Sequence, residues 1–324
     1  MKICFVTNAT SKKDDLTTYD IATAASSRGH DVYFMNVVDF HSNGEKIYGN
    51  VHTIPRKTSE RSALVAALQK EEQTQIDLRK IGAMFLRHKY KRGSKTTENY
   101  HKMAREYAFH LQEEGVFVLN NPVYLPFWSS KIATLRLDSS ILPEHQLVST
   151  NFDKLFEYCK DTLKYEGVLK PAFGAGGEGV YFLERKNLRN TLKSLLENGP
   201  VIAQNYIKNE GDKRILVLGG QPIAWYLRVA GEGELLNNIH AGGKPEKCDL
   251  SERDKKILDI VKPQLVKFGM HFVGIDTLGG YLSEINSDNP GGTIRADAMG
   301  GFDSKGKVVD CIESMILAFC KISQ

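Results

Sequence analysis

The chain has no long hydrophobic run and no cysteine pattern. No apolar stretch reaches the roughly 18 residues that a membrane-spanning helix needs, and the start MKICFVTNAT lacks the long apolar core of a signal peptide. The five cysteines include no C-x-x-C pair, which disfavours a zinc site and a disulfide framework. We therefore expect a cytoplasmic protein without membrane contact, whose thiols are reduced and mostly buried.

Neither sign of charge is in large excess. A formal net charge of +4 at pH 7 is too small to require a nucleic-acid partner, although it suits a protein that handles anionic small molecules. Internal repeats and low-complexity tails are also missing. A chain of 324 residues exceeds one ordinary core, so we expect two or three packed units.

The first part of the chain alternates between strand and helix patterns. The strand ICFVTN is followed by the helical pattern YDIATAASSRG, which ends at Gly29, and then by the strand DVYFMNVV. A second such unit has predicted helices at 62–80 and 97–115 and predicted strands at 81–87 and 116–122. These patterns predict a small α/β domain with a mostly parallel sheet.

The pattern changes after Asn121-Pro122, which marks the end of that unit. A helix, a short strand and a helix come next, followed by a strand, a glycine loop and a strand between 166 and 183. From VIAQNYI at 201–207 onward, tight turns or a single helix connect the strands ILVLGG, QPIAWYLRVA, HFVGIDTL and YLSEIN. This last part is expected to form a larger antiparallel sheet.

The stretch GVLKPAFGAGGEGVYFLE at 167–184 is rich in glycine. A dinucleotide-binding fingerprint should lead from a strand into a helix, whereas GVYFLE after these glycines is β-like. A strand, a flexible glycine loop and a strand suit a flap whose backbone N–H groups close over phosphates. Lys170 would place a charge at the root of that flap. The alternative is a mobile surface hairpin with a solvated lysine.

Polar residues follow the next apolar strand. In VIAQNYIKNEGDKRILVL, the backbone after Gln204 could contact the edge of a purine, and Glu210 or Asp212 could clamp a ribose. The alternative is an ordinary strand and turn, in which the acid only initiates the turn and Arg214 is exposed. Taken alone, the segment leaves both interpretations open.

Three oxygen donors lie in the hairpin pattern VGIDTLGGYLSEIN. Leu-Gly-Gly at 278–280 suits its turn, and period-two alternation places Glu284 and Asn286 on one face, with Asp276 across from them or diagonally opposite. Carboxylate and amide oxygens suit Mg²⁺, which leaves its other positions to water and phosphate. Two buried carboxylates without a cation would be costly. Solvated acids on an exposed face are the alternative, but the apolar opposite face indicates a packed sheet.

Several stretches, in this order, resemble the bacterial-type glutathione synthetases of the ATP-grasp superfamily: KPAFGAGGEGV, AQNYI, GDKRILVLGGQPIAWYLR, NNIHAGG and FVGIDTLGGYLSEIN. The match runs from about 170 to 295 and is weaker over the first 165 residues. The resemblance implies an α/β fold, α+β overall, of the ATP-grasp type. It further implies an N-terminal pre-ATP-grasp substrate domain (1–121), a small central lid domain (122–200) and a C-terminal catalytic domain with an antiparallel sheet (201–324).

The resemblance also implies nucleotide-binding roles. Lys131 and Lys170 would contact phosphates, and the loop 173–179 would close over them. The adenine would lie against the segment 204–207, and Asp212 would meet the ribose. The residues that the resemblance places around ATP are Lys131, Lys170, Gly174, Gly176, Gly177, Gln204, Asn205, Tyr206, Ile207 and Asp212.

Metal and catalytic roles follow from the same resemblance. The hairpin donors Asp276, Glu284 and Asn286 would hold Mg²⁺, with Mn²⁺ as its substitute. The segment VAGEGELLNNIHAGG resembles the mobile loop that closes over the reaction in this family, and a homo-oligomer is the family's usual assembly. The cations that would act on the phosphates and the acyl substrate are Lys170, Arg214 and Arg228.

Two segments depart from the family pattern. Where these synthetases commonly carry Ser-Pro-Thr, this chain has Asn-Pro-Gly-Gly at 289–292 and is one residue longer, which leaves substrate recognition open. In LRHKYKRGSK at 86–95, only Arg87 matches, and this basic run either binds a substrate carboxylate or forms a solvated loop. Arg295 likewise either clamps a carboxylate or pairs with Asp297. The residues expected to contact substrate are Arg87, Arg228, Asn289, Gly291, Gly292 and Arg295.

The activity that the resemblance implies is ATP-dependent formation of an amide bond. Phosphorylation of a substrate carboxylate would give an acylphosphate, which an amine would then attack. Loops that exclude water would protect this intermediate, and no serine or cysteine nucleophile is expected. The leading hypothesis joins γ-glutamylcysteine to glycine. A second keeps the chemistry with another acyl donor or amine, and a third is a non-catalytic ATP-binding interaction protein of the synapsin type.

Overall fold

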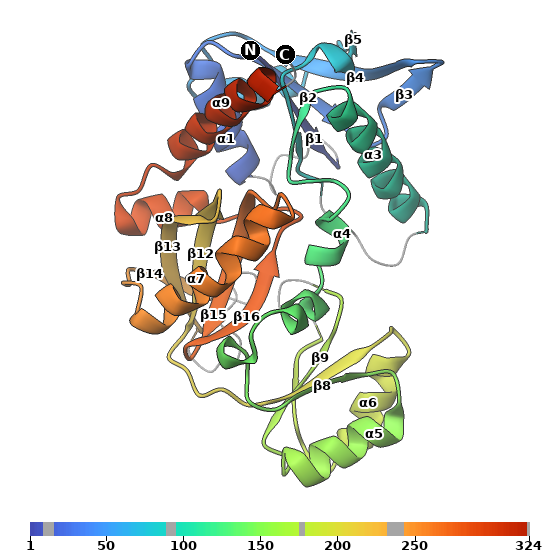
Figure 1. The fold of residues 1–324 in the computed structure, drawn as a ribbon, viewed down its shortest axis with the longest axis vertical. Helices are drawn as coiled ribbons and strands as arrows, with labels where there is room; N and C mark the ends of the chain where they lie inside the picture. The colour runs from blue at the N-terminus through green and yellow to red at the C-terminus, as the bar shows by residue number, and fades with distance from the viewer. Residues whose placement is uncertain (9–15, 89–94, 175–178, 232–242, 323–324) are drawn as a thin grey trace.

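The computed structural model describes residues 1–8, 16–88, 95–174, 179–231 and 243–322. In this part of the chain, the strands form sheets of seven, four and five strands. Figure 1 shows the sheets arranged along the long axis of the molecule, with the N-terminal sheet at one end and the four-stranded sheet at the other. No helix within the described ranges is long and apolar enough to cross a membrane.

The N-terminal sheet has a parallel centre and an antiparallel edge. Its order is β3-β4-β2-β1-β6-β7, with β5 paired to β4. The neighbours β2, β1, β6 and β7 run parallel, which confirms the predicted α/β arrangement. The strands are β1 (Lys2–Thr7), β2 (Asp31–Asn36), β3 (Phe40–Asn43), β4 (Lys46–Ile54), β5 (Thr74–Asp77), β6 (Ala83–Leu86) and β7 (Phe117–Leu119).

The antiparallel edge was not indicated by the sequence. β3 and β4 form a hairpin in which Gly44 takes a left-handed backbone conformation, with φ of 61°. The helix expected over 62–80 was wrong in its second half, because α2 (Arg61–Leu68) ends early. The residues that follow pair with β4 as β5, so their backbone groups are satisfied in the sheet instead of in a helix.

Helices cover both faces of this sheet. Cys4 and Val6 of β1 pack in one apolar cluster with α3 (Lys95–Glu113). Ile3 and Phe5, which point to the opposite face, pack with α1 (Leu16–Ser27) and α2. The alternation along one strand therefore sorts the core into two layers.

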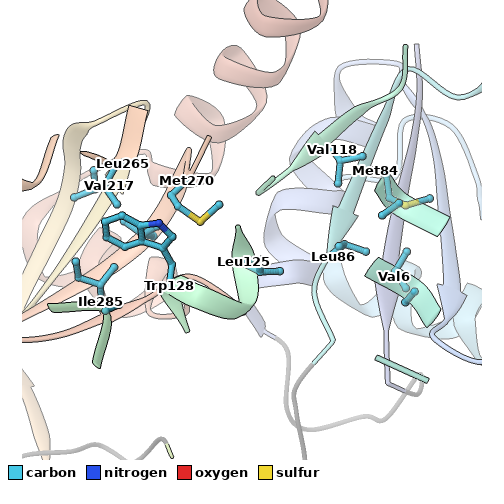
Figure 2. Close-up of a cluster of buried hydrophobic side chains, with 14 of the residues drawn as sticks. Val6, Met84, Leu86, Val118, Leu125, Trp128, Val217, Leu265, Met270 and Ile285 are labelled. Atoms are coloured by element: carbon cyan, nitrogen blue, oxygen red, sulfur yellow. The ribbon is translucent and has the colours of Figure 1, made fainter. Parts of the chain in front are cut away.

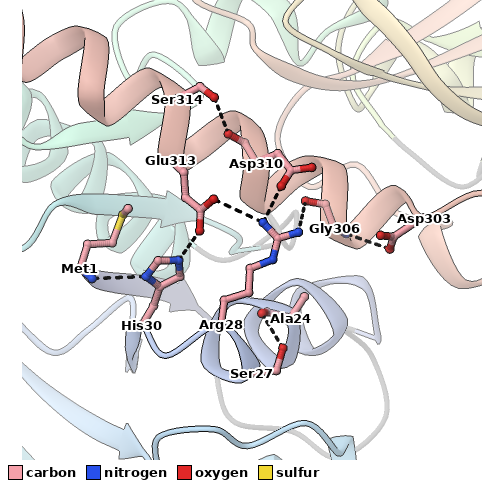
Figure 3. A network of polar contacts seen from close by, with 10 residues as sticks. All are labelled: Met1, Ala24, Ser27, Arg28, His30, Asp303, Gly306, Asp310, Glu313 and Ser314. Atoms are coloured by element: carbon pink, nitrogen blue, oxygen red, sulfur yellow. Dashed lines mark hydrogen bonds and ion pairs between the residues drawn. The ribbon is translucent and has the colours of Figure 1, made fainter.

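The helix α9 (Ser304–Ile322) returns from the far end of the chain to cover the same face as α1. At the rim, Arg28 contacts Asp310 at 2.5 Å and His30 contacts Glu313 at 2.6 Å (Figure 3). The N-terminal and C-terminal parts are thus joined by packing as well as by the linker. The buried residues of α9 in this layer are Val308, Val309 and Ile312.

The four-stranded sheet is antiparallel and has the order β10-β9-β11-β8. The sequence placed VIAQNYI in the larger sheet, but its strand β11 pairs with β8 and β9, because Val201 and Ala203 pack against leucines of this unit. We therefore propose that the central unit extends to Asn205. The elements are β8 (Gln146–Ser149), α5 (Phe152–Glu157), the π-helical turn η4 (Tyr158–Thr162), β9 (Gly167–Pro171), β10 (Tyr181–Phe182), α6 (Leu188–Leu196) and β11 (Val201–Asn205).

The five-stranded sheet is the larger antiparallel sheet that the sequence predicted. Its order is β14-β13-β12-β15-β16, and every neighbouring pair is antiparallel. Figure 1 places it between the other two sheets. The elements are β12 (Asp212–Leu218), β13 (Gln221–Val229), β14 (Lys244–Glu246), α7 (Glu252–Lys267), β15 (Phe272–Leu278), β16 (Tyr281–Asn286) and α8 (Thr293–Gly300).

The short helix α4 (Leu125–Trp128) joins the cores of the N-terminal and C-terminal parts. Figure 2 shows the Trp128 indole beside Met270 and Ile285, with Leu125 on the side of Leu86. All of these residues belong to one buried apolar cluster. Burial of a whole indole makes a large contribution to this contact. The chain then continues through η2 (Lys131–Arg136) and η3 (Ser139–Ile141).

Candidate functional site

The hairpin of β15 and β16 brings the three predicted oxygen donors together. Asp276 pairs directly with Glu284, and Asn286 lies opposite Gly274. The turn residues at 279–280 have φ of 55° and 81°, a conformation that glycine adopts without strain. Of the two positions that the sequence left open for Asp276, the structure shows the one directly across from Glu284.

A shift of register shapes the face of this hairpin. Strict alternation would put Leu282 on the same face as Glu284, two residues further on. The register instead shifts between Asp276 and Thr277. Leu282 and Ile285 are consequently both buried, at 1% and 2% exposure, while Glu284 is half-buried. The bulge lets the core keep its leucine without displacing the donor.

Asp276 belongs to a buried group of alternating charges. Arg214 binds both oxygens of Asp276, at 2.5 Å from Nε and 2.9 Å from Nη2. Arg228 contacts the same carboxylate at 2.9 Å and binds Asp212 at 2.6 and 2.5 Å. The pairs Arg214–Asp276 and Arg228–Asp212 are cross-strand neighbours, so the sheet register brings these opposite charges together, whereas Arg228 reaches Asp276 across the intervening strand β12.

The two hairpin carboxylates therefore differ in their surroundings. Burial opposes ionisation of Asp276, but Arg214 and Arg228 outweigh burial and lower the pKa of Asp276. Glu284 makes no hydrogen bond or salt bridge with any residue that the structure describes. Asp276 is thus already neutralised, whereas Glu284 is available to a ligand.

Two lysines approach the hairpin from the four-stranded sheet and its linker. Lys170 on β9 is buried, and its electrostatic neighbours are Lys131 and Glu284. Desolvation, helped by repulsion from Lys131, lowers the pKa of Lys170 to about 8, and Glu284 opposes this shift. Lys131 donates from Nζ to the carbonyl of Gly174 at 2.7 Å. The two predicted phosphate contacts therefore lie near one another, and Lys170 also lies near the predicted metal ligand Glu284.

Gly174 and Gly179 lie on either side of the glycine loop. Their φ values of 147° and 74° are in the region that favours glycine. The flanking strands β9 and β10 pair antiparallel, which confirms the strand, loop and strand arrangement. Gly176 and Gly177 lie outside the described residues, as does most of VAGEGELLNNIHAGG, and their roles stay predictions.

The side chains of Asn205 and Tyr206 are directed toward the four-stranded sheet itself. The side-chain Oδ1 of Asn205 accepts a hydrogen bond from the main-chain N–H of His145 at 3.2 Å. The main-chain N–H of Asn205 donates to the carbonyl of His145 at 3.1 Å. The Tyr206 ring lies against Phe182, with centroids 5.6 Å apart. Contact of these two residues with a purine would therefore use the backbone, as the sequence analysis assumed.

Gln204 and Ile207 lie where the chain passes from the four-stranded to the five-stranded sheet. Gln204 is buried, and its Oε1 has no hydrogen-bond partner among the described residues. A ligand that offers a donor would satisfy this atom, because a buried unpaired acceptor is unfavourable. Ile207 packs so closely on the hairpin turn that a Cβ at Gly279 would lie 2.5 Å from its Cγ2.

The loop 289–292 is held from two sides. Arg87 donates to the carbonyl of Pro290 at 3.0 Å and to Thr18 Oγ1 at 2.8 Å. Arg214 donates to the next carbonyl at 3.1 Å. Arg87 is only 3% exposed, so it holds the loop in place from the protein interior. Its direct contact with substrate stays a prediction, and the sequence had no signal for the role of Thr18.

The two glycines of this loop differ in their surroundings. Gly292 has φ of 114°, and a Cβ there would lie 2.7 Å from the Tyr226 hydroxyl. Its N–H donates to Thr17 Oγ1 at 3.2 Å at the start of α8. A Cβ at Gly291 would meet only Thr17 Oγ1, at 3.7 Å. Glycine is thus needed at 292 for the backbone, but not at 291.

Arg295 is the remaining predicted basic residue that the structure describes. Arg295 lies in the first turn of α8, and its expected alternative partner Asp297 accepts instead from Ser304 N at 3.1 Å. The Arg295–Asp297 pair is therefore not formed in the part of the chain that the structure describes. The other cations of the basic run, Lys89, Lys91 and Arg92, lie outside the described residues.

The donors Asp276, Glu284 and Asn286 suit a metal ion whose remaining ligands come from phosphate groups. No group of three or more His, Cys, Asp or Glu side chains could hold a metal within the described ranges. Two carboxylates and one amide nevertheless suit Mg²⁺ when phosphate and water oxygens complete its shell. Glu284 and Asn286 are half-buried, so they are accessible to such an ion. Within the described residues, the protein alone does not supply a complete set of metal ligands.

Two family models match the chain. The model for the N-terminal domain of prokaryotic glutathione synthetase matches residues 1–125, and the model for its ATP-grasp domain matches residues 130–300. The second model alone spans more than half of the chain. The chain belongs to the prokaryotic glutathione synthetase family.

Curated relatives agree with this family. The glutathione synthetase of Gloeobacter violaceus is 37% identical over 202 residues, which is 60% of this chain and 60% of that protein. The glutathione synthetase of Agrobacterium fabrum is 40% identical over 154 residues, covering 45% and 48% of the two chains. The matched segments thus span less than two thirds of these relatives' length.

Solved structures share the fold over almost the whole chain. The macrocyclase MdnC from Microcystis aeruginosa has a TM-score of 0.67 at 15% identity. The alignment covers 97% of this chain and 100% of that chain. The ATP-grasp ligase PsnB has a TM-score of 0.65 at 18% identity, with 96% and 98% covered. At these identities, the likeness shows the ATP-grasp fold of this glutathione synthetase family member and no more.

This family member also has a polar cluster that the sequence did not indicate. The rings of His88 and His101 are 4.4 Å apart and both are buried. Arg105 lies one turn further along α3 and acts electrostatically on both. Burial raises the pKa of Asp288 to about 6, against the effects of Arg105 and of a hydrogen bond with Ser129. Only the spacing of His101 and Arg105 was visible in the sequence.

Proposed function

We propose that this protein is an ATP-dependent carboxylate-amine ligase that joins γ-glutamylcysteine to glycine. The observation that carries the proposal is the position of Lys170, on the four-stranded sheet, which interacts electrostatically both with Lys131 and with Glu284 of the five-stranded sheet. Two cations next to a free acid suit a metal–nucleotide complex, and the ATP-grasp fold supports ATP as the nucleotide. Membership in the glutathione synthetase family supports the two substrates.

The binding residues would act on phosphates from two directions. Lys170 from β9 and Lys131 from η2 would contact phosphate oxygens, and the burial of Lys170 would strengthen its attraction to a phosphate. Gln204 and the backbone after it contact the adenine, and Asp212 the ribose. Mg²⁺, or Mn²⁺ in its place, would be held by the hairpin donors and would neutralise charge between the phosphates. The flap at 173–179 would then close over the nucleotide.

The reaction would proceed in two steps. An oxygen of the cysteinyl carboxylate attacks the γ-phosphorus, so that the bond to ADP breaks and an acylphosphate forms. The amine nitrogen of glycine then attacks the acyl carbon, phosphate leaves and the nitrogen loses a proton. Arg214 and Arg228, which both bind Asp276, would supply positive charge to the oxygens that become negative. Positioning and exclusion of water supply most of the rate.

The test is coupled release of ADP with Mg²⁺-ATP, γ-glutamylcysteine and glycine, each omitted in turn, with the product identified by mass. The proposal expects glutathione only when all components are present. We also propose small-molecule substrates alone, a cytoplasmic location and a homo-oligomer, as in other members of the family. Size-exclusion chromatography with light scattering tests the assembly.

A second candidate keeps the chemistry and changes a substrate. The loop 289–292 is one residue longer than the Ser-Pro-Thr of typical members, and it is bound by Arg87 and Arg214 next to the reacting groups. Another acyl donor or another amine would suit a changed loop. ADP release across a panel of dipeptides and amino acids distinguishes the two candidates, since each expects a different pair to be the best substrates.

A further inference from the structure

A polar cluster lies at the carboxyl edge of the N-terminal sheet, on the side that α3 covers. This α3 cluster consists of His88, which follows β6, His101 and Arg105 on α3, and Asp288, which follows β16. The carboxyl ends of parallel strands are where open α/β sheets bind ligands. Segments from both ends of the chain therefore meet at a place suited to a binding site.

Several buried polar atoms at this junction have no hydrogen-bond partner. Main-chain and amide contacts hold the segments together, because Arg87 N donates to Val6 O at 2.8 Å and Asn120 Nδ2 donates to Ser287 O at 2.9 Å. Buried polar atoms are normally bonded, so a concentration of exceptions indicates a polar ligand. Among the described residues, the unpaired atoms here are Thr7 Oγ1, His88 Nδ1, Ser287 Oγ and Asn289 Oδ1.

The charges of the α3 cluster are balanced. Arg105 supplies one cation and Asp288 one anion, and the two interact electrostatically. Desolvation lowers the pKa of His101 to about 4 and lowers the pKa of His88 as well, so both imidazoles are neutral at pH 7. A cation, an anion and neutral donors and acceptors complement a group that carries both an ammonium and a carboxylate.

The position of the cluster relative to the reacting groups fits an extended substrate. Asp288 is two residues beyond the donor Asn286, and Asn289, the next residue, begins the loop 289–292 that Arg87 and Arg214 bind. A carboxylate that reacts beside Glu284 would leave the other end of its molecule directed along 286–289. Two extended residues span up to about 7 Å, which is the scale of this step.

On the basis of the proposed function, we propose that the α3 cluster recognises the amino-acid head group of the acyl donor. Arg105 binds the α-carboxylate at the end remote from the reacting carboxylate, and Asp288 binds the α-ammonium. The imidazole of His88 and the amide of Asn289 bond the remaining polar atoms. The substrate class is thus a γ-linked dipeptide with a free amino-acid head, and not any carboxylate of similar length.

The first test uses the unmodified protein and three acyl donors. γ-Glutamylcysteine has both head charges, 4-aminobutyrylcysteine lacks the α-carboxylate, and N-glutarylcysteine lacks the α-ammonium. Loss of one hydrogen bond to a charged group should lower kcat/KM by at least about tenfold for each analogue. Turnover of both analogues within about twofold of γ-glutamylcysteine overturns the inference. This comparison does not depend on the folding of any variant.

The second test assigns each charge to its residue. Arg105→Met should lower kcat/KM for γ-glutamylcysteine at least about tenfold but leave that for 4-aminobutyrylcysteine unchanged, because the analogue has no group for Arg105 to bind. Asp288→Asn should do the same with N-glutarylcysteine. The KM values for ATP and glycine should not change. Lys102→Met, on the exposed side of α3, is the matched control and should behave as the unmodified protein.

The outcomes separate the two proposals. Equal losses with all three donors in Arg105→Met would mean a structural role for Arg105 and would overturn the assignment, while the ligase activity stands. If the unmodified protein forms glutathione but does not discriminate among the three donors, the role of the whole α3 cluster is overturned, while the ligase activity again stands. No turnover of γ-glutamylcysteine by the unmodified protein contradicts the proposed function, and the inference falls with it.

Discussion

Asp276 and Glu284 face one another across β15 and β16, yet of the two only Asp276 is bound by arginines among the residues that the structure describes. Arg214 and Arg228 neutralise Asp276 inside the sheet, whereas Glu284 is half-buried beside Lys170. The two carboxylates should therefore respond differently to mutation. One is needed for the fold of the sheet as well as for the site, and the other for the site alone.

Replacement of the free carboxylate should remove activity without loss of stability. Glu284→Gln deletes one charge but breaks no hydrogen bond or salt bridge that the structure describes. We expect no detectable ADP release and an unchanged melting temperature. Glu252→Gln, whose side chain is 88% exposed on α7, is the control and should retain full activity. Full activity in Glu284→Gln would end the assignment of this residue to the metal.

Replacement of the paired carboxylate should instead destabilise the protein. Asp276→Asn leaves Arg214 and Arg228 buried with one anion, Asp212, between them. Removal of one partner from a buried ion pair costs about 3–5 kcal/mol. Urea unfolding should show this loss relative to Glu284→Gln, for which we expect none. Equal stability of the two variants would contradict the structural role of Asp276.

The pKa of Lys170 predicts a pH dependence of nucleotide binding. Burial and Lys131 lower this pKa to about 8, so Lys170 is cationic below pH 8 and loses its charge above it. The dissociation constant for Mg²⁺-ADP should therefore rise between pH 7 and pH 9.5, by at most about tenfold per pH unit. Calorimetric titration measures the effect. Lys170→Met should bind weakly at every pH without this step, and a flat profile in the unmodified protein would refute the assignment.

The two glycines of the loop 289–292 should differ when each is replaced by alanine. Gly292→Ala introduces a side chain at φ of 114° and against Tyr226, which should destabilise the protein by about 1–3 kcal/mol. Gly291→Ala has room for its Cβ and should change stability by no more than about 0.5 kcal/mol. If the loop contacts substrate, Gly291→Ala should still raise the KM of the acyl donor or glycine. Unchanged KM values would place the loop outside the substrate site.

Local patterns explain what the sequence could predict. The strands β9 and β10 on either side of the glycine loop and the hairpin with Asp276, Glu284 and Asn286 each lie within about twenty residues, and both pairs of strands formed as expected. The buried position of Lys170 beside Lys131 could be anticipated only from the family, because the two lysines come from different elements.

Pairing between segments far apart in the chain explains which features the sequence could not predict. The segment after Leu68 is helical by composition, but pairing with β4 takes it into the sheet as β5. No local signal assigns β11 to one sheet or the other. The same holds for the α3 cluster, because Asp288 meets Arg105 only once the N-terminal and C-terminal parts pack together.

The most direct test of the ligase assignment is ADP release with γ-glutamylcysteine and glycine, with mass identification of the product. Glutathione should form, with one ADP released per peptide bond, and only in the presence of Mg²⁺ or Mn²⁺ and both substrates. Binding of Mg²⁺-ATP without turnover of these substrates, or of any pair in the panel of dipeptides and amino acids, would contradict the ligase assignment.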